Sequence, residues 1–133
     1  MIQAVIFDYD WVLSKYFRLQ PPMFKLAKDL RQKNIKTAVL SNRTSLLKWY
    51  VKLRGTLKDF DPVVYCTDLG HRKPDPAPYK IVLEKLGIEP TNCLFIDNRT
   101  ENIQTAQELG MKTILAKNTQ QTIADIKKHL SVK

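Results

Sequence analysis

Short hydrophobic runs alternate with amphipathic stretches along the chain, and this alternation occurs five times. The runs are rich in β-branched and aromatic residues and show no polar alternation, which is typical of strands that are covered on both faces. The pattern therefore predicts five strands, at Ile2–Phe7, Thr37–Leu40, Val63–Cys66, Cys93–Ile96 and Thr113–Leu115.

The stretches that follow the runs carry hydrophobic residues at helical spacing. Pro21 and Pro22 indicate the start of a helix, and Gly87 and Gly110 stand where helices commonly end. The expected helices are Met23–Lys33, about Thr44 to Leu53, Ala77–Leu86, about Glu101 to Leu109, and Thr119–Leu130. Strands that alternate with helices favour parallel βαβ units, so we predict a doubly wound, three-layer α/β/α fold of the Rossmann-like type with a five-stranded parallel sheet.

Length and composition limit the class of protein. The 133 residues suit one domain over 1–133, and no linker or repeat divides them. No hydrophobic stretch approaches the roughly 20 residues of a membrane span, and the acidic start MIQAVIFDYD is unlike a signal peptide. Cys66 and Cys93 form no CxxC motif, which argues against a disulfide scaffold or a cysteine-rich zinc site. We expect two reduced, packed thiols in a cytoplasmic protein.

The net charge of +9 is unevenly distributed. Residues 1–58 hold 12 Lys and Arg against 3 Asp and Glu, whereas residues 59–133 hold 10 of each kind. The excess in the first part of the chain suits an acidic partner, such as nucleic acid, an acidic protein or a phosphorylated protein that contacts basic residues 15–58. The alternative is a basic, solvated face that has no partner.

Polar residues follow the predicted strands at the points where they end. Asp8 and Asp10 follow the first strand, Ser41-Asn42 the second and Asp97-Asn98 the fourth, while Arg72-Lys73 lies in the connection after the third. The carboxyl ends of parallel strands meet at one edge of a sheet, which is where such folds bind ligands. These side chains are therefore expected to converge on one site.

The residue types of this edge fit phosphate chemistry. Carboxylates such as Asp8, Asp10 and Asp97 are ligands for Mg²⁺, and a lysine such as Lys73 can neutralise a phosphate. Ser41 precedes a predicted helix, where a hydroxyl and free backbone N–H groups can hold an anion. An aspartate in such a site could act as nucleophile and form an aspartyl-phosphate, with Asp10 as proton donor and acceptor.

Four segments, in this order along the chain, resemble the motifs of the haloacid dehalogenase-like (HAD) hydrolase superfamily. They are Ile6-Phe7-Asp8-Tyr9-Asp10, Val39-Leu40-Ser41-Asn42, Arg72-Lys73-Pro74-Asp75-Pro76 and Leu94-Phe95-Ile96-Asp97-Asn98. Four motifs in order on predicted strand ends make a specific signal. The KPDP segment and Asn102-Ile103-Gln104-Thr105-Ala106 are similar to the phosphatase-like branch in particular.

The resemblance implies a role for each residue. Asp8 would be the nucleophile and Asp10 the general acid and base, with its backbone carbonyl on Mg²⁺; Ser41 and Lys73 would hold the phosphoryl group. The candidate sets are catalytic Asp8, Asp10, Ser41 and Lys73; substrate-binding Ser41, Asn42, Lys73 and Trp11; and metal-binding Asp8, Asp10 and Asp97. Residues 14–20 would form the small flap that usually follows the first motif. The expected activity is a Mg²⁺-dependent phosphohydrolase.

Three features depart from the family pattern. Trp11 stands where a small glycine is usual, and its alternative role is packing; Asn98 replaces the second acid of many relatives, which predicts a slow or selective enzyme. Only 30 residues separate Asp10 from Ser41, too few for a cap domain beside the expected helix. The site should therefore be open and suit a large or polyanionic phosphorylated substrate.

Other phosphate-binding folds lack support in this sequence. The glycines at 55, 70, 87 and 110 form neither GxGxxG nor GxxxxGK[ST], and a receiver domain would place its lysine last, where this chain has Asp97. Two functional hypotheses remain: the phosphohydrolase, and a non-catalytic or weakly active module of the same fold that binds phosphate or an acidic partner. Retention of the catalytic set favours the enzyme.

Overall fold

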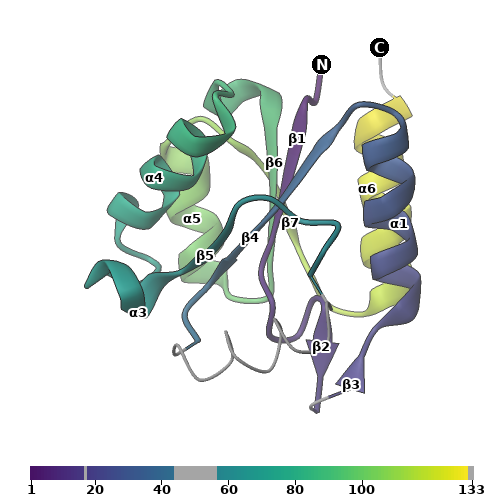
Figure 1. The fold of residues 1–133 in the computed structure, drawn as a ribbon, viewed down its shortest axis with the longest axis horizontal. Coiled ribbons are helices and arrows are strands. Elements are labelled where there is room, and N and C mark those ends of the chain that lie inside the picture. Colours follow the sequence, from purple (N-terminus) through teal and green to yellow (C-terminus); the bar gives the residue numbers. More distant parts are fainter. Residues whose placement is uncertain (17, 44–56, 132–133) are drawn as a thin grey trace.

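The computed structural model describes residues 1–16, 18–43 and 57–131. Its central sheet has five parallel strands in the order β5-β4-β1-β6-β7 (Figure 1). The strands are β1 Ala4–Phe7, β4 Lys36–Ser41, β5 Val63–Tyr65, β6 Cys93–Asp97 and β7 Lys112–Leu115. The predicted five-stranded parallel sheet is confirmed.

Helices cover both faces of this sheet, as Figure 1 shows. The helices α1 Pro21–Gln32 and α6 Thr119–Ser131 pack together on one face, and α4 Pro76–Leu86 and α5 Thr100–Glu108 lie on the other. Two short elements are α3 Cys66–Leu69 and the 3₁₀ turn η1 Pro90–Asn92. The expected helix from about Thr44 to Leu53 lies outside the described residues.

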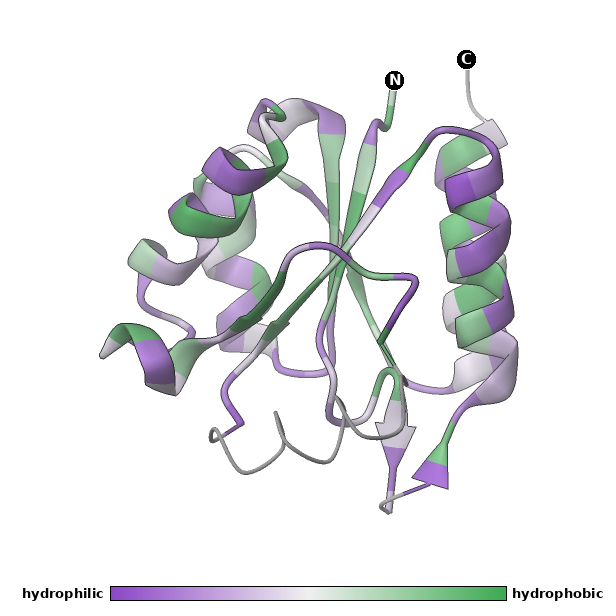
Figure 2. Cartoon of the chain, viewed as in Figure 1, coloured by the Kyte–Doolittle hydropathy of each residue, from purple (hydrophilic) through white to green (hydrophobic). Residues whose placement is uncertain are grey.

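Alternating residues of β1 divide the hydrophobic core into two layers. Val5 and Phe7 contribute to the cluster under α1 and α6, whereas Ala4 and Ile6 contribute to the cluster under α4 and α5. The middles of the central strands are mainly apolar, and the helices turn their hydrophobic residues inward (Figure 2). This two-sided burial explains why the strands appear in the sequence as continuous hydrophobic runs.

The segment after β1 forms a small antiparallel hairpin. Its strands are β2 Ser14–Lys15 and β3 Arg18–Leu19, and it occupies the place at which residues 14–20 were expected to form a flap. Val12 and Leu13 are fully buried at its base, which fixes the hairpin to the core. Figure 1 shows it at the same end of the molecule as the carboxyl end of β1.

Several predicted boundaries differ from the structure by one or two residues; β1, for example, begins at Ala4, and β4 runs from Lys36 to Ser41. At Cys66 the predicted element itself is wrong. Cys66 was expected to end the third strand, but it begins helix α3. The pairing of β4 with β5 ends at Ser41 and Tyr65, so Cys66 has no strand residue opposite it. Cys66 and Cys93 are both buried, free thiols, as expected. None of the helices in the described part of the chain has the length and hydrophobicity needed to cross a membrane.

Candidate active site

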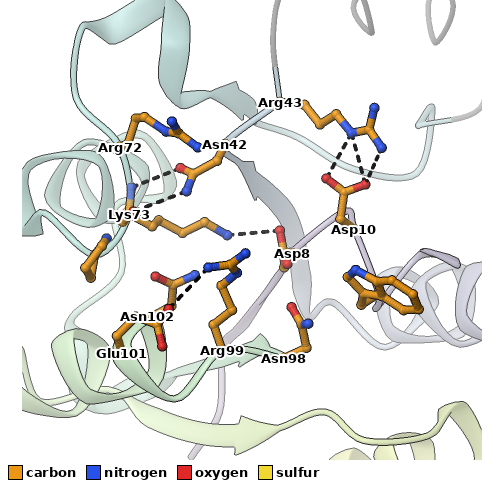
Figure 3. A pocket seen from close by; sticks show the side chains of 12 residues that line it. Asp8, Asp10, Asn42, Arg43, Arg72, Lys73, Asn98, Arg99, Glu101 and Asn102 are labelled. Carbon is orange, nitrogen blue, oxygen red and sulfur yellow. Dashed lines mark hydrogen bonds and ion pairs between the residues drawn. The ribbon is translucent and has the colours of Figure 1, made fainter. Parts of the chain in front are cut away.

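A pocket of about 570 Å³ opens at the carboxyl ends of the strands (Figure 3). Five of the predicted site residues line it, namely Asp8, Asp10, Trp11, Asn42 and Lys73. Asp8 directly follows β1, and its backbone N–H extends the strand by donating to the carbonyl of Ile96 (2.9 Å). The sheet register therefore positions this carboxylate at the base of the pocket.

Lys73 is the central charge of the site. Its ammonium donates to Asp8 Oδ1 (3.0 Å), to Asp97 Oδ2 (2.8 Å) and to the carbonyl oxygen of Leu40 (2.8 Å). These three bonds use all three protons of the ammonium. The side chain of Lys73 is 1% exposed, so one buried cation joins the ends of β1, β4 and β6.

Asn42 positions Lys73 through a reciprocal pair of hydrogen bonds. The backbone N–H of Lys73 donates to Asn42 Oδ1 (2.9 Å), and Asn42 Nδ2 donates to the Lys73 carbonyl (3.2 Å). The two loops are thereby held together, and Figure 3 shows the pair beside the labelled Lys73 and Asp8. This residue was predicted to contact substrate; the structure gives it a positioning contact in addition to its place in the pocket wall.

The two buried carboxyl groups of Asp8 and Asp97 share the single ammonium of Lys73. Burial raises the pKa of Asp8 to about 7; Lys73 opposes this rise, and the neighbouring Asp97 adds to it. Burial also acts to lower the pKa of Lys73, but Asp8 and Asp97 outweigh it and the net direction is upward. Lys73 is therefore charged, and a further cation beside Asp8 would favour the ionised form of this carboxyl group.

The carboxylates at the base of the pocket are candidate ligands for Mg²⁺. Within the described residues, no group of three or more His, Cys, Asp or Glu side chains is placed to hold a metal ion. Magnesium, however, is commonly held by one or two carboxylates together with water and a phosphate. Asp8 and Asp97 supply two such carboxylates, and Asp8 Oδ2 accepts no hydrogen bond from the described residues. The chemistry of the pair fits this ion.

The carboxylate of Asp10 is bound by Arg43, a contact that the sequence analysis missed. Arg43 Nε donates to both carboxylate oxygens (3.0 and 2.9 Å), and its Nη2 lies 2.9 Å from Oδ1. The two side chains are 39% and 36% exposed, at the mouth of the pocket. Asp10 was predicted as a metal-binding residue; with its carboxylate engaged in this way, its backbone carbonyl remains the candidate donor.

Ser41 and Asp97 lie behind the pocket wall. Both are fully buried, and neither lines the pocket. Ser41 Oγ accepts the backbone N–H of Arg43 (3.0 Å), so it shapes the loop that carries Arg43. Asp97 also accepts hydrogen bonds from the Arg99 backbone N–H (3.0 Å) and from Asn102 Nδ2 (3.1 Å). The structure therefore shows Ser41 in a loop-shaping contact, and its predicted contact with phosphate stays a prediction.

Three arginines of the pocket were not among the predicted site residues, namely Arg43, Arg72 and Arg99. A signal for each was present, since each directly adjoins a residue of a sequence motif, namely Asn42, Lys73 or Asn98. Arg99 Nη1 lies 3.3 Å from Glu101 Oε1, and Figure 3 shows the labelled Arg99 near the centre of the pocket. Together with Lys73 these groups make the pocket suitable for a multiply charged anion.

Comparison with known proteins identifies sequence relatives of the chain. The sequence matches the haloacid dehalogenase-like hydrolase family over residues 2–110. It is 31% identical over 131 residues to phosphatase MT3486 of Mycobacterium tuberculosis, covering 97% of this chain and 58% of that protein. It is 30% identical over 128 residues to bifunctional epoxide hydrolase 2 of Sus scrofa, covering 90% of this chain and 22% of that protein. The chain thus spans only part of the length of these relatives.

Two solved structures resemble the fold. A predicted HAD-like family hydrolase from Porphyromonas gingivalis superposes with a TM-score of 0.85 at 18% identity, covering 100% of both chains. A HAD-family enzyme from Bacteroides thetaiotaomicron, in complex with magnesium and inorganic phosphate, superposes with a TM-score of 0.63 at 26% identity, covering 72% of this chain and 52% of that one.

Proposed function

The chain belongs to the haloacid dehalogenase-like hydrolase family, and from this premise we propose that it is a Mg²⁺-dependent phosphatase that carries the phosphoryl group on Asp8. The observation that carries the proposal is the buried Lys73, which joins Asp8 to Asp97 at the base of a pocket lined with cations. Such a site combines a desolvated carboxylate with positive charge for a phosphoryl group.

Lys73 and the bonds around it orient the nucleophile. Asp8 Oδ1 accepts from Lys73 and from the backbone N–H of Tyr9 (2.9 Å), which leaves Oδ2 as the oxygen available for attack. In the first step this oxygen bonds to phosphorus, the bond from phosphorus to the leaving oxygen breaks, and Asp10 supplies a proton to that oxygen. The product is an alcohol and an aspartyl-phosphate.

The second step returns the enzyme to its starting form. Water attacks the phosphorus of the aspartyl-phosphate, Asp10 accepts a proton from the water, and inorganic phosphate leaves as the Asp8 carboxylate is restored. For Asp10 to exchange these protons, Arg43 must release at least one of its carboxylate oxygens. The phosphate group of the substrate is an anion that can compete with the Asp10 carboxylate for Arg43.

Mg²⁺ would be held by Asp8 and Asp97, with the Asp10 backbone carbonyl as a third donor. When bound, it would neutralise charge on the phosphoryl oxygens. Asn102 supports this arrangement because it donates to Asp97 Oδ2 and fixes the direction of that carboxylate. The magnesium and phosphate complex of the related Bacteroides enzyme agrees with the choice of ion.

We also propose that the substrate is large or polyanionic. The chain between Asp10 and Ser41 is used by the β2–β3 hairpin and α1, so no cap domain lies there to cover the pocket. Asp10 and Arg43 are partly exposed at its mouth, and several arginines surround it. An acidic protein or nucleic acid that contacts basic residues 15–58 remains a candidate partner, although part of that range lies outside the described residues.

The proposal is tested by hydrolysis of a simple aryl phosphate, with Mg²⁺ and with a chelator. Asp8→Asn is compared with Asp29→Asn, because Asp29 is an exposed aspartate of α1 that does not line the pocket. We expect turnover that needs Mg²⁺, that Asp8→Asn abolishes and that Asp29→Asn retains. Turnover by Asp8→Asn equal to that of the wild type would contradict the proposal. Absence of turnover across a panel of phosphate esters would favour the phosphate-binding module.

A further inference from the structure

Two aromatic side chains stand at the mouth of the pocket and have no role in the chemistry described above. Trp11 lines the pocket and is 43% exposed, and Tyr16 is 80% exposed on the adjoining hairpin. Among the residues that the structure describes, they are the only aromatic side chains that are exposed to this degree. Large aromatic surface in contact with water commonly marks a binding site.

The two rings contact each other edge to face. Their centroids are 4.9 Å apart and their planes are inclined at 81°. In this geometry the ring that supplies its edge keeps both of its own faces uncovered by the other ring. The pair can therefore accept a third flat ring, and its mutual contact restricts the rotamers of both side chains.

The backbone holds Trp11 outward at some conformational cost. Trp11 and Tyr16 both have positive φ values, 67° and 49°, in the left-handed region that side chains with a Cβ avoid. The Trp11 N–H donates to the Ser14 carbonyl (2.6 Å), and the next residue, Val12, is buried in the core. Glycine would fit this turn without strain, yet a tryptophan occupies it. Unfavourable conformations of this kind cluster at functional sites.

Trp11 differs in chemical character from most of the pocket wall. Apart from Trp11 and Pro74, every lining residue is polar or charged, which suits the phosphate end of a substrate. The indole is therefore the aromatic surface of the pocket wall, and Trp11 directly follows Asp10 in the chain. A phosphate ester that places its phosphorus at Asp8 would carry its leaving group past Asp10, the proposed proton donor, and toward Trp11.

We propose that Trp11 and Tyr16 form an aromatic platform that binds the leaving group, and that the preferred substrates are phosphate monoesters of a flat aromatic or heterocyclic group. The proposal rests on the phosphatase function proposed above and assigns its substrate class. Stacking on one aromatic side chain contributes enough binding free energy to set such a preference, and it requires no hydrogen bond from the protein.

The test compares 1-naphthylmethyl phosphate with ethyl phosphate. Both release a primary alcohol, so the comparison reports binding of the leaving group and not its acidity. We expect the wild type to favour the naphthylmethyl ester in kcat/KM, and Trp11→Ala to reduce this selectivity roughly tenfold, the size expected for one stacking contact. Tyr16→Ala should reduce it by a smaller factor, and Trp11→Phe should restore most of it.

The matched control is Leu19→Ala. Leu19 lies in β3 of the same hairpin, is 39% exposed and does not line the pocket. It should leave the selectivity unchanged, and thermal melting of every variant reports whether the hairpin still folds. Equal selectivity in Trp11→Ala, Tyr16→Ala and the wild type would overturn the platform while leaving the phosphatase intact.

A different result is expected if the protein is not a phosphatase. If the wild type hydrolyses neither ester, binding of (1-naphthylmethyl)phosphonate and of ethylphosphonate is measured by calorimetry on the same proteins. Tighter binding of the naphthylmethyl compound that Trp11→Ala weakens roughly tenfold would support the platform without catalysis. Equal binding of the two compounds, or equal binding by wild type and Trp11→Ala, would overturn it.

Discussion

At the scale of single residues, the site depends on how Lys73 is enclosed. Its three donors meet two carboxylates and one carbonyl, and its side chain is almost wholly buried. The ion pairs themselves need not add much net stability, because burying the charges is costly. Removal of one partner, by contrast, leaves the remaining charges uncompensated.

Lys73→Met should therefore lower the free energy of unfolding strongly, by about 3 kcal/mol, because Asp8 and Asp97 would lose their shared cation. Urea unfolding in the presence of a chelator measures this change. Lys80→Met is the matched control, since Lys80 is an exposed residue of α4, and its effect should stay within about 0.5 kcal/mol. Equal stability of the two variants would show that Lys73 does not balance the buried acids.

Sequence reasoning found the residues that end hydrophobic runs and missed the residues that reach them from elsewhere. Asp8, Asp97 and Lys73 were predicted because strand ends converge at one edge of a parallel sheet. The pairing of Arg43 with Asp10 was not predicted, because 33 positions separate the two residues and a long side chain can reach several partners. The outward placement of Trp11 was likewise left open, since an indole suits core packing equally well.

At the scale of secondary-structure elements, α4 follows the loop that carries Lys73, and a glycine marks its C-terminal end. Gly87 follows its last residue with φ 67°, and its N–H donates to the carbonyls of Leu83 and Glu84. No atom lies within 4 Å of the position that a Cβ at Gly87 would occupy. Any cost of a side chain there is therefore conformational and not steric.

Gly87→Ala should lower the free energy of unfolding by about 1 kcal/mol, because alanine disfavours the left-handed region. Gly87→Asn is the matched comparison and should cost less, since asparagine adopts this conformation more readily. Chemical denaturation of the three proteins measures both changes. The same stability for Ala and Gly at this position would contradict the assigned role of the helix end.

The hydrophobic pattern predicted the long elements and overlooked the short ones. Five strands and the four long described helices, α1, α4, α5 and α6, follow from runs and periodicity, because burial on two faces or one stripe leaves a clear pattern. The four-residue helix α3 was not predicted. The strands β2 and β3 have two residues each, and η1 has three, so none is long enough to show a period. The change from strand to helix at Cys66 depends on where β4 stops, which is a tertiary property.

At the scale of the whole molecule, the core buries several weak acids in protonated form. Burial raises the pKa of Cys93 to about 12, and it also raises the pKa values of Cys66 and Tyr79. Above about pH 9 the unfolded chain loses these protons while the folded chain keeps them. The folded state then binds more protons, so the free energy of unfolding falls as the pH rises.

Cys93→Ala should show a shallower fall in stability between about pH 8 and pH 10 than the wild type, by about 1 kcal/mol over that range. The alanine variant is less stable at every pH because it loses buried volume, so the slope and not the absolute value is compared. Urea unfolding at both pH values provides the measurement. Parallel slopes for the two proteins would mean that the Cys93 thiol ionises as readily in the folded state as in the unfolded state.

The net charge of the sequence was a poor guide to which basic residues are available for a partner. The excess of basic residues in 1–58 was counted as a potential surface for acidic partners, but some of these groups serve the fold or the site. Arg31 donates through Nε to Thr37 Oγ1 (2.8 Å) and to the Asp59 carbonyl (2.6 Å), and Arg43 binds Asp10. Lys25 and Lys28 do lie exposed on α1. A composition count does not separate these cases.

The central claim is that Asp8 carries the phosphoryl group, and the most direct test is to find it there. The Asp10→Asn variant is mixed with Mg²⁺ and an activated aryl phosphate, whose leaving phenolate needs little protonation, so that the first step proceeds and the second is slowed. Acid quenching and mass spectrometry of the digested protein then locate any covalent phosphoryl group. The account predicts one phosphoryl group on the peptide that contains Asp8, and none when Asp8 is also replaced by Asn. Steady release of phosphate with no adduct, or an adduct at another residue, would contradict it.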